Sequence, residues 1–157
     1  MFQLTKGSYT ATFENIFNSC PLETVIAFVP SQAYSGSFTE NPFNFKHYGV
    51  NFIEVSLDNI SQPGVALKPA FAMKNYTEAY LRLFDSSLEN QQLGIHFDEF
   101  PNGASLFRFE LTSKPKKGNI RISLRFAEAL PEGVSMILYS KFQSQFEITD
   151  TRNVIEQ

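Results

Sequence analysis

The stretch Asn119-Ile-Arg-Ile-Ser-Leu-Arg-Phe126 decides the fold, because apolar and polar residues alternate along it without a break. Successive side chains of a β-strand point to opposite faces, so a period of two is typical of a half-buried strand. One face here carries four apolar residues, namely Ile120, Ile122, Leu124 and Phe126. The stretch therefore predicts a strand with this face in a core and the two arginines on the other face.

Working outward, the same alternation appears at 105–111, 52–58 and 8–17, with Asn15 as an exception in the last. Residues 22–29 are almost continuously apolar, which indicates a strand covered on both faces. The stretch 134–148 is long for a single strand. We therefore expect a bend or bulge within it, where the chain changes sheets.

One stretch, 75–88, has helical rather than strand periodicity. Its apolar residues recur at spacings of three and four, namely Tyr76, Ala79, Tyr80 and Leu83. Asn75 and Glu78 have the spacing of a capping box, and Glu78 and Arg82 have that of a helical ion pair. The pattern predicts one helix inserted between strands, with its apolar stripe packed on the sheet rather than on a ligand.

Turn signals separate these stretches: Asn41-Pro42, Gln62-Pro63-Gly64, Pro101-Asn102-Gly103, Lys117-Gly118-Asn119 and Pro131-Glu132-Gly133. Seven or eight short strands with one helix in a connection favour an all-β fold, an antiparallel two-sheet jelly-roll sandwich. An immunoglobulin-type sandwich is less favoured, because the chain has one cysteine and no tryptophan. With 157 residues and no linker-like stretch, we expect a single jelly-roll domain over 1–157.

The composition narrows the classes of function. A formal net charge of −3 gives no overall attraction to nucleic acid. With Cys20 alone, an internal disulfide or a multi-cysteine metal site is excluded. The N-terminus does not have the pattern of a signal peptide, and no apolar run is long enough to span a membrane. We expect no cofactor.

Candidate catalytic residues are few. His96 and Asp98 form the first half of a two-histidine, one-carboxylate iron site, but the remaining histidine, His47, precedes them. Cys20 has no neighbouring base that would lower its pKa. We therefore expect a protein that is not an enzyme, with His96 as an ordinary loop or edge residue.

Aromatic residues gather in a segment broken by Gly36 and Pro42. Phe38, Phe43 and Phe45, with Tyr48, are more aromatic residues than a hairpin loop needs. Two interpretations remain open: the aromatic group plugs one end of the sandwich, or it anchors a subunit contact, where such residues are enriched.

Basic residues concentrate in one place, at Lys114, Lys116 and Lys117, followed by Arg121 and Arg125 on one strand face. This cluster is a possible contact for phosphate or for an acidic neighbouring subunit. A solvated turn is the simpler interpretation.

Several motifs resemble one known family. They are Ala33-Tyr-Ser-Gly36, Asn41-Pro-Phe-Asn-Phe-Lys-His47, the strand with Glu54 and Val55, Tyr76-Thr-Glu-Ala-Tyr-Leu-Arg-Leu-Phe84, Gly118-Asn-Ile-Arg121, Leu124-Arg-Phe-Ala127, Ala129-Leu-Pro131, Phe146-Glu-Ile148 and Arg152-Asn-Val-Ile155. In this order they resemble the C-terminal part of the adenovirus-lineage, jelly-roll capsid-type proteins encoded by Polinton (Maverick) transposons.

The resemblance implies a virus-like structural protein that self-assembles, as a homotrimer and with other capsid-type subunits, in a virion or virus-like particle, or otherwise inside a cell. We expect the contacts at loops and sheet edges, above all at Tyr34, Phe38, Asn41, Pro42, Phe43, Phe45, His47 and Tyr48. The alternative is a jelly-roll binding module for a carbohydrate or a host protein.

Overall fold

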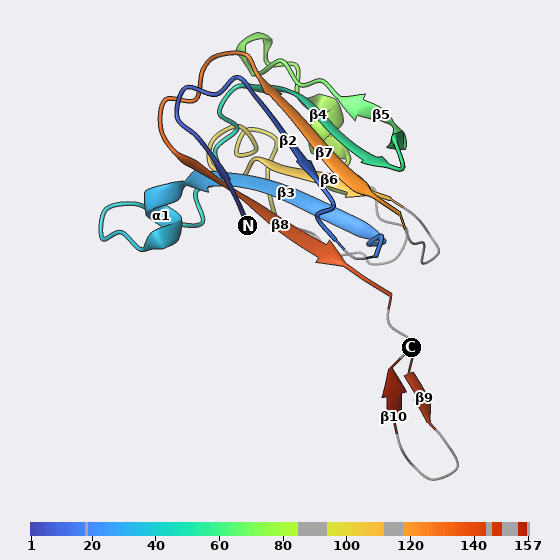
Figure 1. Ribbon diagram of the computed structural model, residues 1–157. Coiled ribbons are helices and arrows are strands. Elements are labelled where there is room, and N and C mark those ends of the chain that lie inside the picture. Colours follow the sequence, from blue (N-terminus) through green and yellow to red (C-terminus); the bar gives the residue numbers. More distant parts are fainter. Residues whose placement is uncertain (18, 85–93, 112–117, 144–145, 149–153, 157) are drawn as a thin grey trace.

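A computed structural model describes residues 1–17, 19–84, 94–111, 118–143, 146–148 and 154–156. Two four-stranded antiparallel sheets dominate it (Figure 1). The first has the order β1 (Phe2–Leu4), β8 (Val134–Lys141), β3 (Glu23–Pro30), β6 (Leu106–Glu110). The second has the order β2 (Thr10–Glu14), β7 (Ile120–Phe126), β4 (Val50–Leu57), β5 (Ile60–Leu67).

The pairing is that of a jelly roll. β1 pairs with β8, β2 with β7, β3 with β6 and β4 with β5, so the chain is folded as a nested hairpin. β3 also pairs with β8, and β4 with β7, which joins the nested pairs into two sheets. The predicted jelly-roll sandwich is confirmed.

The core lies between the sheets and is made by the predicted alternation. On β7, Ile120, Ile122, Leu124 and Phe126 are all buried. β3 contributes Ile26 and Phe28 to the same core, while Ala27 and Val29 on its other face are also buried. The prediction that the 22–29 strand is covered on both faces is therefore confirmed for its second half, whereas Val25 on the outer face is only part-buried.

The elements that were not predicted include β1, β5 and the short helix α1 (Ser31–Ser35). The expected turn at Gln62-Pro63-Gly64 is wrong, because these residues lie within β5. Their strand is the edge of its sheet, and its register with β4 shifts along this stretch. An edge strand tolerates a proline, since the missing N–H faces no partner strand.

The inserted helix is shorter than expected. A 3₁₀ turn (Phe71–Met73) precedes α2 (Thr77–Leu81), and residues 85–88 of the predicted helix lie outside the described residues. Asn75 is not the N-cap, because its backbone N–H and C=O both pair with Ala70, and Tyr76 takes that position. The predicted packing is confirmed, since Tyr76, Ala79 and Leu83 are buried in the core.

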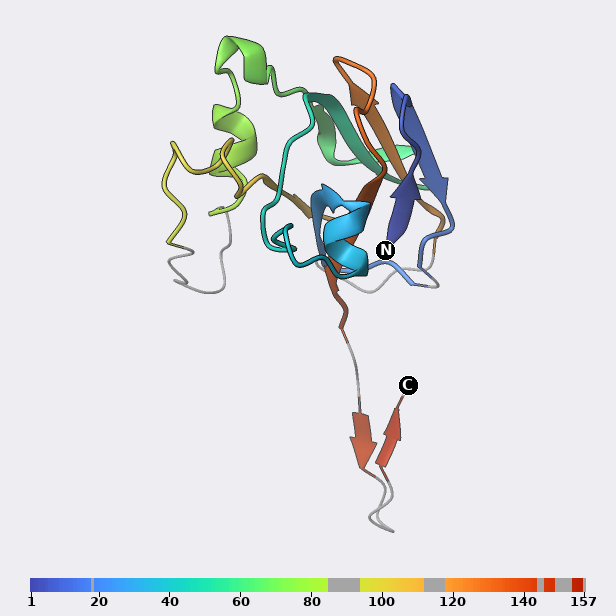
Figure 2. The ribbon, with the colours of Figure 1, turned by 90° about the vertical axis from the view of Figure 1, so that its left-hand side faces the viewer.

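The predicted strand 134–148 is interrupted. β8 ends at Lys141, and β9 (Phe146–Ile148) pairs with β10 (Val154–Glu156) in a separate hairpin. This hairpin stands away from the sandwich in two perpendicular views (Figures 1 and 2). We expected the chain to change sheets within this stretch. Instead, β9 pairs with β10 and does not join the second sheet of the sandwich.

Candidate functional site

The segment between β3 and β4 leaves the sandwich, turns and comes back. It begins with α1, which projects at one end of the sheets (Figures 1 and 2). We call residues 34–43 the tip and residues 44–49 the base. The two parts differ in what surrounds their aromatic side chains.

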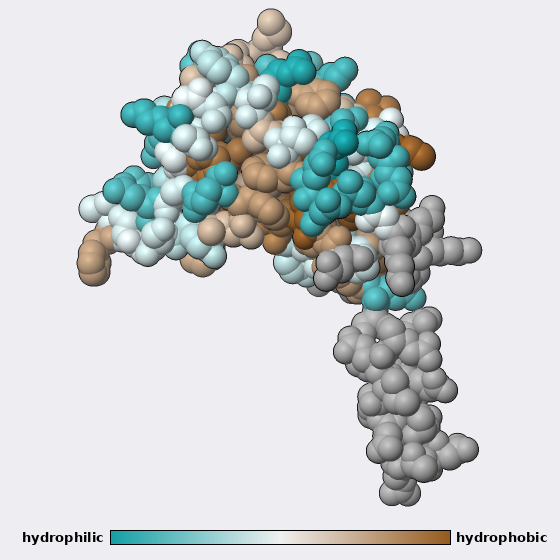
Figure 3. All heavy atoms as spheres, viewed as in Figure 1, coloured by the Kyte–Doolittle hydropathy of each residue, from teal (hydrophilic) through white to brown (hydrophobic). Residues whose placement is uncertain are grey.

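The tip displays its aromatic residues to solvent. Tyr34 is 49% exposed, Phe43 is 76% exposed and Phe38 is fully exposed. Figure 3 shows an apolar projection at the outer end of the segment beyond α1, with mostly polar surface next to it. Burial of a phenylalanine side chain is worth roughly 1.5–3 kcal/mol, so isolated display of two such rings forgoes that stabilisation.

Side chain to backbone hydrogen bonds hold the tip in shape. Ser37 Oγ accepts from the backbone N–H of Thr39 at 3.2 Å and of Glu40 at 3.3 Å. Asn41 Oδ1 accepts from the backbone N–H of Phe43 at 2.9 Å, which forms the turn expected at Asn41-Pro42. Such local turns set the direction of the neighbouring side chains before any partner binds.

The base is attached to the sandwich through its backbone. The N–H of Phe45 donates to the Gly103 carbonyl at 2.8 Å, and the Phe45 carbonyl accepts from Ser105 at 3.1 Å. The N–H of Lys46 donates to the Phe28 carbonyl of β3 at 3.0 Å. The half-buried Phe45 therefore forms part of one end of the sandwich.

His47 continues this attachment with its ring. It stacks on Phe71 with the ring centroids 3.9 Å apart, and its Nδ1 accepts from the backbone N–H of Gly49 at 2.8 Å. Phe71 in turn stacks on Tyr76 and Phe100, which belong to the core. Burial lowers the pKa of His47, which favours the neutral imidazole that this hydrogen bond requires.

Tyr48 ties the base to the turn before β8. Its hydroxyl donates to Glu132 Oε1 at 2.9 Å, and Lys46 Nζ lies 3.7 Å from the same oxygen. Burial, followed by the hydrogen bond to Glu132 and the negative charges of Glu132 and Glu40, raises the pKa of Tyr48. The hydroxyl therefore stays protonated and donates across the physiological range.

The predicted aromatic group thus divides into two. Phe45, His47 and Tyr48 close one end of the sandwich, so the plug interpretation applies to them. The plug interpretation is excluded for the exposed residues, which are Tyr34, Phe38, Asn41, Pro42 and Phe43. Within this group, the aromatic residues available to a partner are therefore those of the tip.

The predicted basic patch is described only in part. Lys114, Lys116 and Lys117 lie outside the described residues. Arg121 Nε lies 2.9 Å from Glu14 Oε1, and the Arg125 guanidinium lies over the ring of Phe52 at 5.4 Å. Both arginines are on the face of β7 away from the core, and each already has a neighbour within its own sheet.

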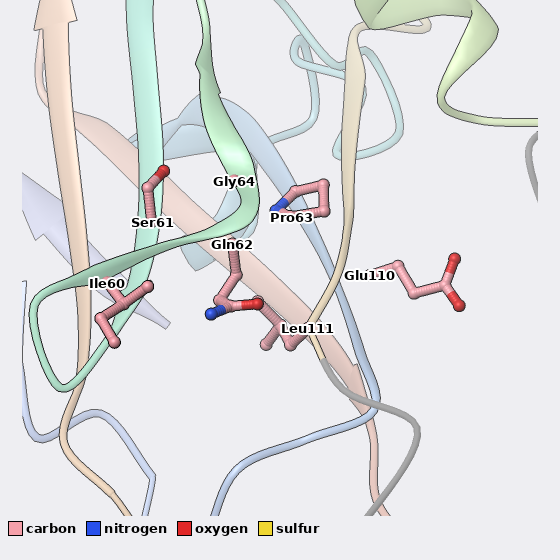
Figure 4. A pocket seen from close by; sticks show the side chains of 7 residues that line it. All are labelled: Ile60, Ser61, Gln62, Pro63, Gly64, Glu110 and Leu111. Atoms are coloured by element: carbon pink, nitrogen blue, oxygen red, sulfur yellow. The ribbon is translucent and has the colours of Figure 1, made fainter.

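A shallow, open hollow of about 510 Å³ lies where the edge strands β5 and β6 approach each other (Figure 4). Its lining is Ile60, Ser61, Gln62, Pro63, Gly64, Glu110 and Leu111. None of the predicted site residues lines it.

Residues considered for catalysis lie in unrelated places. His96 is exposed in a turn, where its backbone N–H donates to Glu99 Oε2 at 2.9 Å, while His47 is in the base. Cys20 is buried, and its Sγ lies 3.4 Å from the Pro21 carbonyl. Within the part of the chain that the structure describes, no three His, Cys, Asp or Glu side chains are grouped as metal ligands would be.

One surface was not singled out in advance: the face of the first sheet that points away from the core. Residues of β8 with the opposite parity to its core residues lie there, among them Ile137 and Tyr139, with Val25 of β3 across from Tyr139. Tyr139 is 65% exposed. The signal for this surface was present in the sequence, as apolar residues on both faces of one strand.

Comparisons with known proteins give one informative similarity. The chain is 27% identical over 173 aligned positions to "Uncharacterized protein F54H12.2" of Caenorhabditis elegans. The alignment covers 98% of this chain and 41% of the worm protein, so the chain spans less than half of that relative. No family model matches the sequence. No solved structure matches it either.

The structure was also searched for membrane spans. Across the described ranges, no helix combines the length and the apolar character that crossing a bilayer requires.

Proposed function

We propose that this chain is a capsid-type structural protein that self-associates, as a homotrimer, through the tip of the segment between β3 and β4. In this proposal it assembles with further copies and with other capsid-type subunits into a virus-like particle. Its role is structural rather than catalytic.

The observation that carries the proposal is the exposed, preorganised aromatic tip. Phe38 and Phe43 are displayed on a loop whose turns are fixed by Ser37 and Asn41. Aromatic residues are enriched at interfaces, and a loop already held in shape loses less conformational entropy on binding. The surface is therefore suited to a protein partner.

The fold is compatible with this role, since eight-stranded jelly rolls occur in viral capsid proteins as well as in lectins and cupins. The resemblance to the Polinton capsid-type family favours the first of these. The worm relative is longer than this chain. We propose that such longer relatives carry a further capsid-type domain beside the one described.

A binding module for a carbohydrate or a host protein is the second candidate. Phe38 and Phe43 are exposed and Glu40 lies between them in the sequence, and aromatic rings with a carboxylate are a combination that carbohydrate sites use. However, Asn41 Oδ1 is already occupied by the backbone of its own turn. This leaves fewer free polar groups for sugar hydroxyls, so assembly is favoured.

The test is absolute molar mass by light scattering over a range of concentrations, with negative-stain microscopy of the same samples. We expect a discrete trimer or a larger closed particle for the parent chain and a folded monomer for Phe43→Ser. The matched control is Tyr9→Ser, because Tyr9 is an exposed aromatic residue outside the segment. It should assemble as the parent does.

A parent chain that stays monomeric at high concentration would overturn the proposed self-assembly. Binding to a carbohydrate array that is lost in Phe43→Ser would then support the second candidate.

A further inference from the structure

α1 covers one end of the outer face of the β1-β8-β3-β6 sheet. Ala27 and Val29 of β3 and Ala33 of α1 are buried, yet none belongs to the core between the sheets. They form a small separate contact, in which α1 packs on β3 and β8. A polar network seals this end, because Ser31 Oγ donates to Gln3 Oε1 at 2.7 Å and Ser135 Oγ to Ser31 Oγ at 3.2 Å.

Beyond α1, the same face carries the part-exposed Val25 and Ile137 and the exposed Tyr139. Beside Val25 lies Arg108 of β6, which is buried and bonds to Glu23 and to the Arg82 carbonyl. Strand register places Ile137 opposite Ala27, and Tyr139 opposite Val25. We call Val25, Ile137, Tyr139 and Lys141 the sheet patch. In a β-strand, residues two apart share a face, so Tyr139 and Lys141 lie side by side along β8.

The charge on the sheet patch is opposite to that of the tip. Lys141 is exposed, and no ion pair is formed by it within the described residues. Glu23, its cross-strand neighbour, already pairs with Arg108 at 2.7 Å. The tip carries Glu40 between Phe38 and Phe43. The tip thus combines aromatic side chains with one negative charge, and the sheet patch combines Tyr139 and two aliphatic side chains with one positive charge.

We propose that the tip of one copy docks on the sheet patch of a second copy, with Phe38 and Phe43 against Tyr139 and Ile137, and Glu40 near Lys141. The inference rests on the proposed self-assembly and names the two surfaces that meet. Within one copy, the tip does not pack on the sheet patch, because Phe38 remains fully exposed.

The two surfaces are different parts of one molecule, so the contact is heterologous. Such a contact repeats from copy to copy and closes into a ring when the rotation allows it. A three-membered ring matches the proposed trimer. An isologous contact of tip with tip would instead bring two Glu40 carboxylates together, which is repulsive.

The first experiment is a charge swap, read by trimer dissociation in light scattering. Glu40→Lys and Lys141→Glu should each weaken assembly by about tenfold or more, because each places like charges across the contact. The double variant should recover most of the parent's assembly. Failure of the double variant to recover, with normal thermal melting of all three proteins, would overturn the inference.

The second experiment mixes two variants that are each expected to be monomeric. Phe38→Ser keeps an intact sheet patch, and Tyr139→Ser keeps an intact tip. Their mixture should form a one-to-one dimer through a single complete contact, whereas neither variant associates alone. The dimer supports a heterologous contact.

The outcomes separate this inference from the proposed function. If the parent assembles and Tyr139→Ser assembles equally well, the sheet patch is not the partner surface and the inference is overturned, while self-assembly stands. If the parent does not assemble at all, both fail. Circular dichroism and thermal melting of each variant establish that loss of assembly is not loss of folding.

Discussion

The tip and the base of one segment use aromatic residues in opposite ways. At the base, His47 stacks on Phe71, which leads through Phe100 into the core. At the tip, Phe38 and Phe43 contact solvent. The comparison shows that aromatic content by itself does not distinguish a ring that stabilises a fold from one that is displayed for a partner. Which of the two roles a ring has is decided by the residues that surround it in the folded chain.

The largest expected effect is at the core end of this aromatic series. Phe100 is fully buried, and its ring centroid lies 5.8–6.3 Å from those of four other aromatic residues. Phe100→Ala should lower the free energy of unfolding by about 3–5 kcal/mol, since a large cavity is left. Urea denaturation measures this.

The matched control is the same substitution at the tip, Phe43→Ala. Under conditions where the chain is monomeric it should change the unfolding free energy by less than about 0.5 kcal/mol. Similar losses in the two variants would contradict the division between tip and base.

The second prediction concerns the ring of His47. His47→Ala at pH 8 should cost about 1–3 kcal/mol, because it removes an aromatic stack and the acceptor for the Gly49 N–H. Urea denaturation again gives the value. A change below about 0.5 kcal/mol would mean that the base is held by its backbone alone.

The same histidine predicts a pH dependence. Burial places its folded-state pKa below the ordinary value of 6.5, so the unfolded chain takes up the proton first as pH falls. The stability that neutral His47 contributes is complete above about pH 6.5 and decreases below it, towards the lowered pKa. The urea concentration at the unfolding midpoint should therefore be lower at pH 5.5 than at pH 8.

Two variants check the assignment. His47→Gln should flatten this pH profile, while His96→Gln, at the exposed histidine, should keep the profile of the parent. If His47→Gln loses as much stability on acidification as the parent, another group is responsible.

A smaller effect is expected from Tyr48→Phe, which removes the hydroxyl that donates to Glu132. The expected loss is about 0.5–1.5 kcal/mol, the usual range for one hydrogen bond. Tyr34→Phe is the control, because the hydroxyl of Tyr34 has no hydrogen-bond partner among the described residues and lies at the exposed tip. Thermal melting of the two variants compares base with tip directly.

Much of the fold could be predicted because its core strands alternate strictly. The pattern at 119–126 leads directly to β7, and similar patterns lead to β2, β4, β6 and β8, while the nearly continuous apolar run at 22–29 leads to β3. β5 could not be found in this way, since Pro63 and Gly64 are turn signals that an edge strand tolerates. β1 has three residues, too few for a pattern.

The candidate site could be predicted only as a group. Phe45 and Tyr48 differ from Phe38 and Phe43 because they bond to Gly103 and Glu132, which are far away in the sequence. The sequence around the segment holds no sign of these contacts. They arise when the connection before β6 and the turn before β8 meet at the same end of the sandwich.

The smallest expected effect on the isolated chain is that of Phe38→Ser, below about 0.5 kcal/mol, because Phe38 loses no intramolecular packing. Its effect should nevertheless depend on concentration. Contacts between copies stabilise the folded state by mass action, so their contribution grows with protein concentration. Thermal melting at low and high concentration should show a deficit for Phe38→Ser only at high concentration. Phe100→Ala should show the same deficit at both concentrations. If the deficit of Phe38→Ser did not depend on concentration either, the Phe38 ring would belong to the fold rather than to an interface.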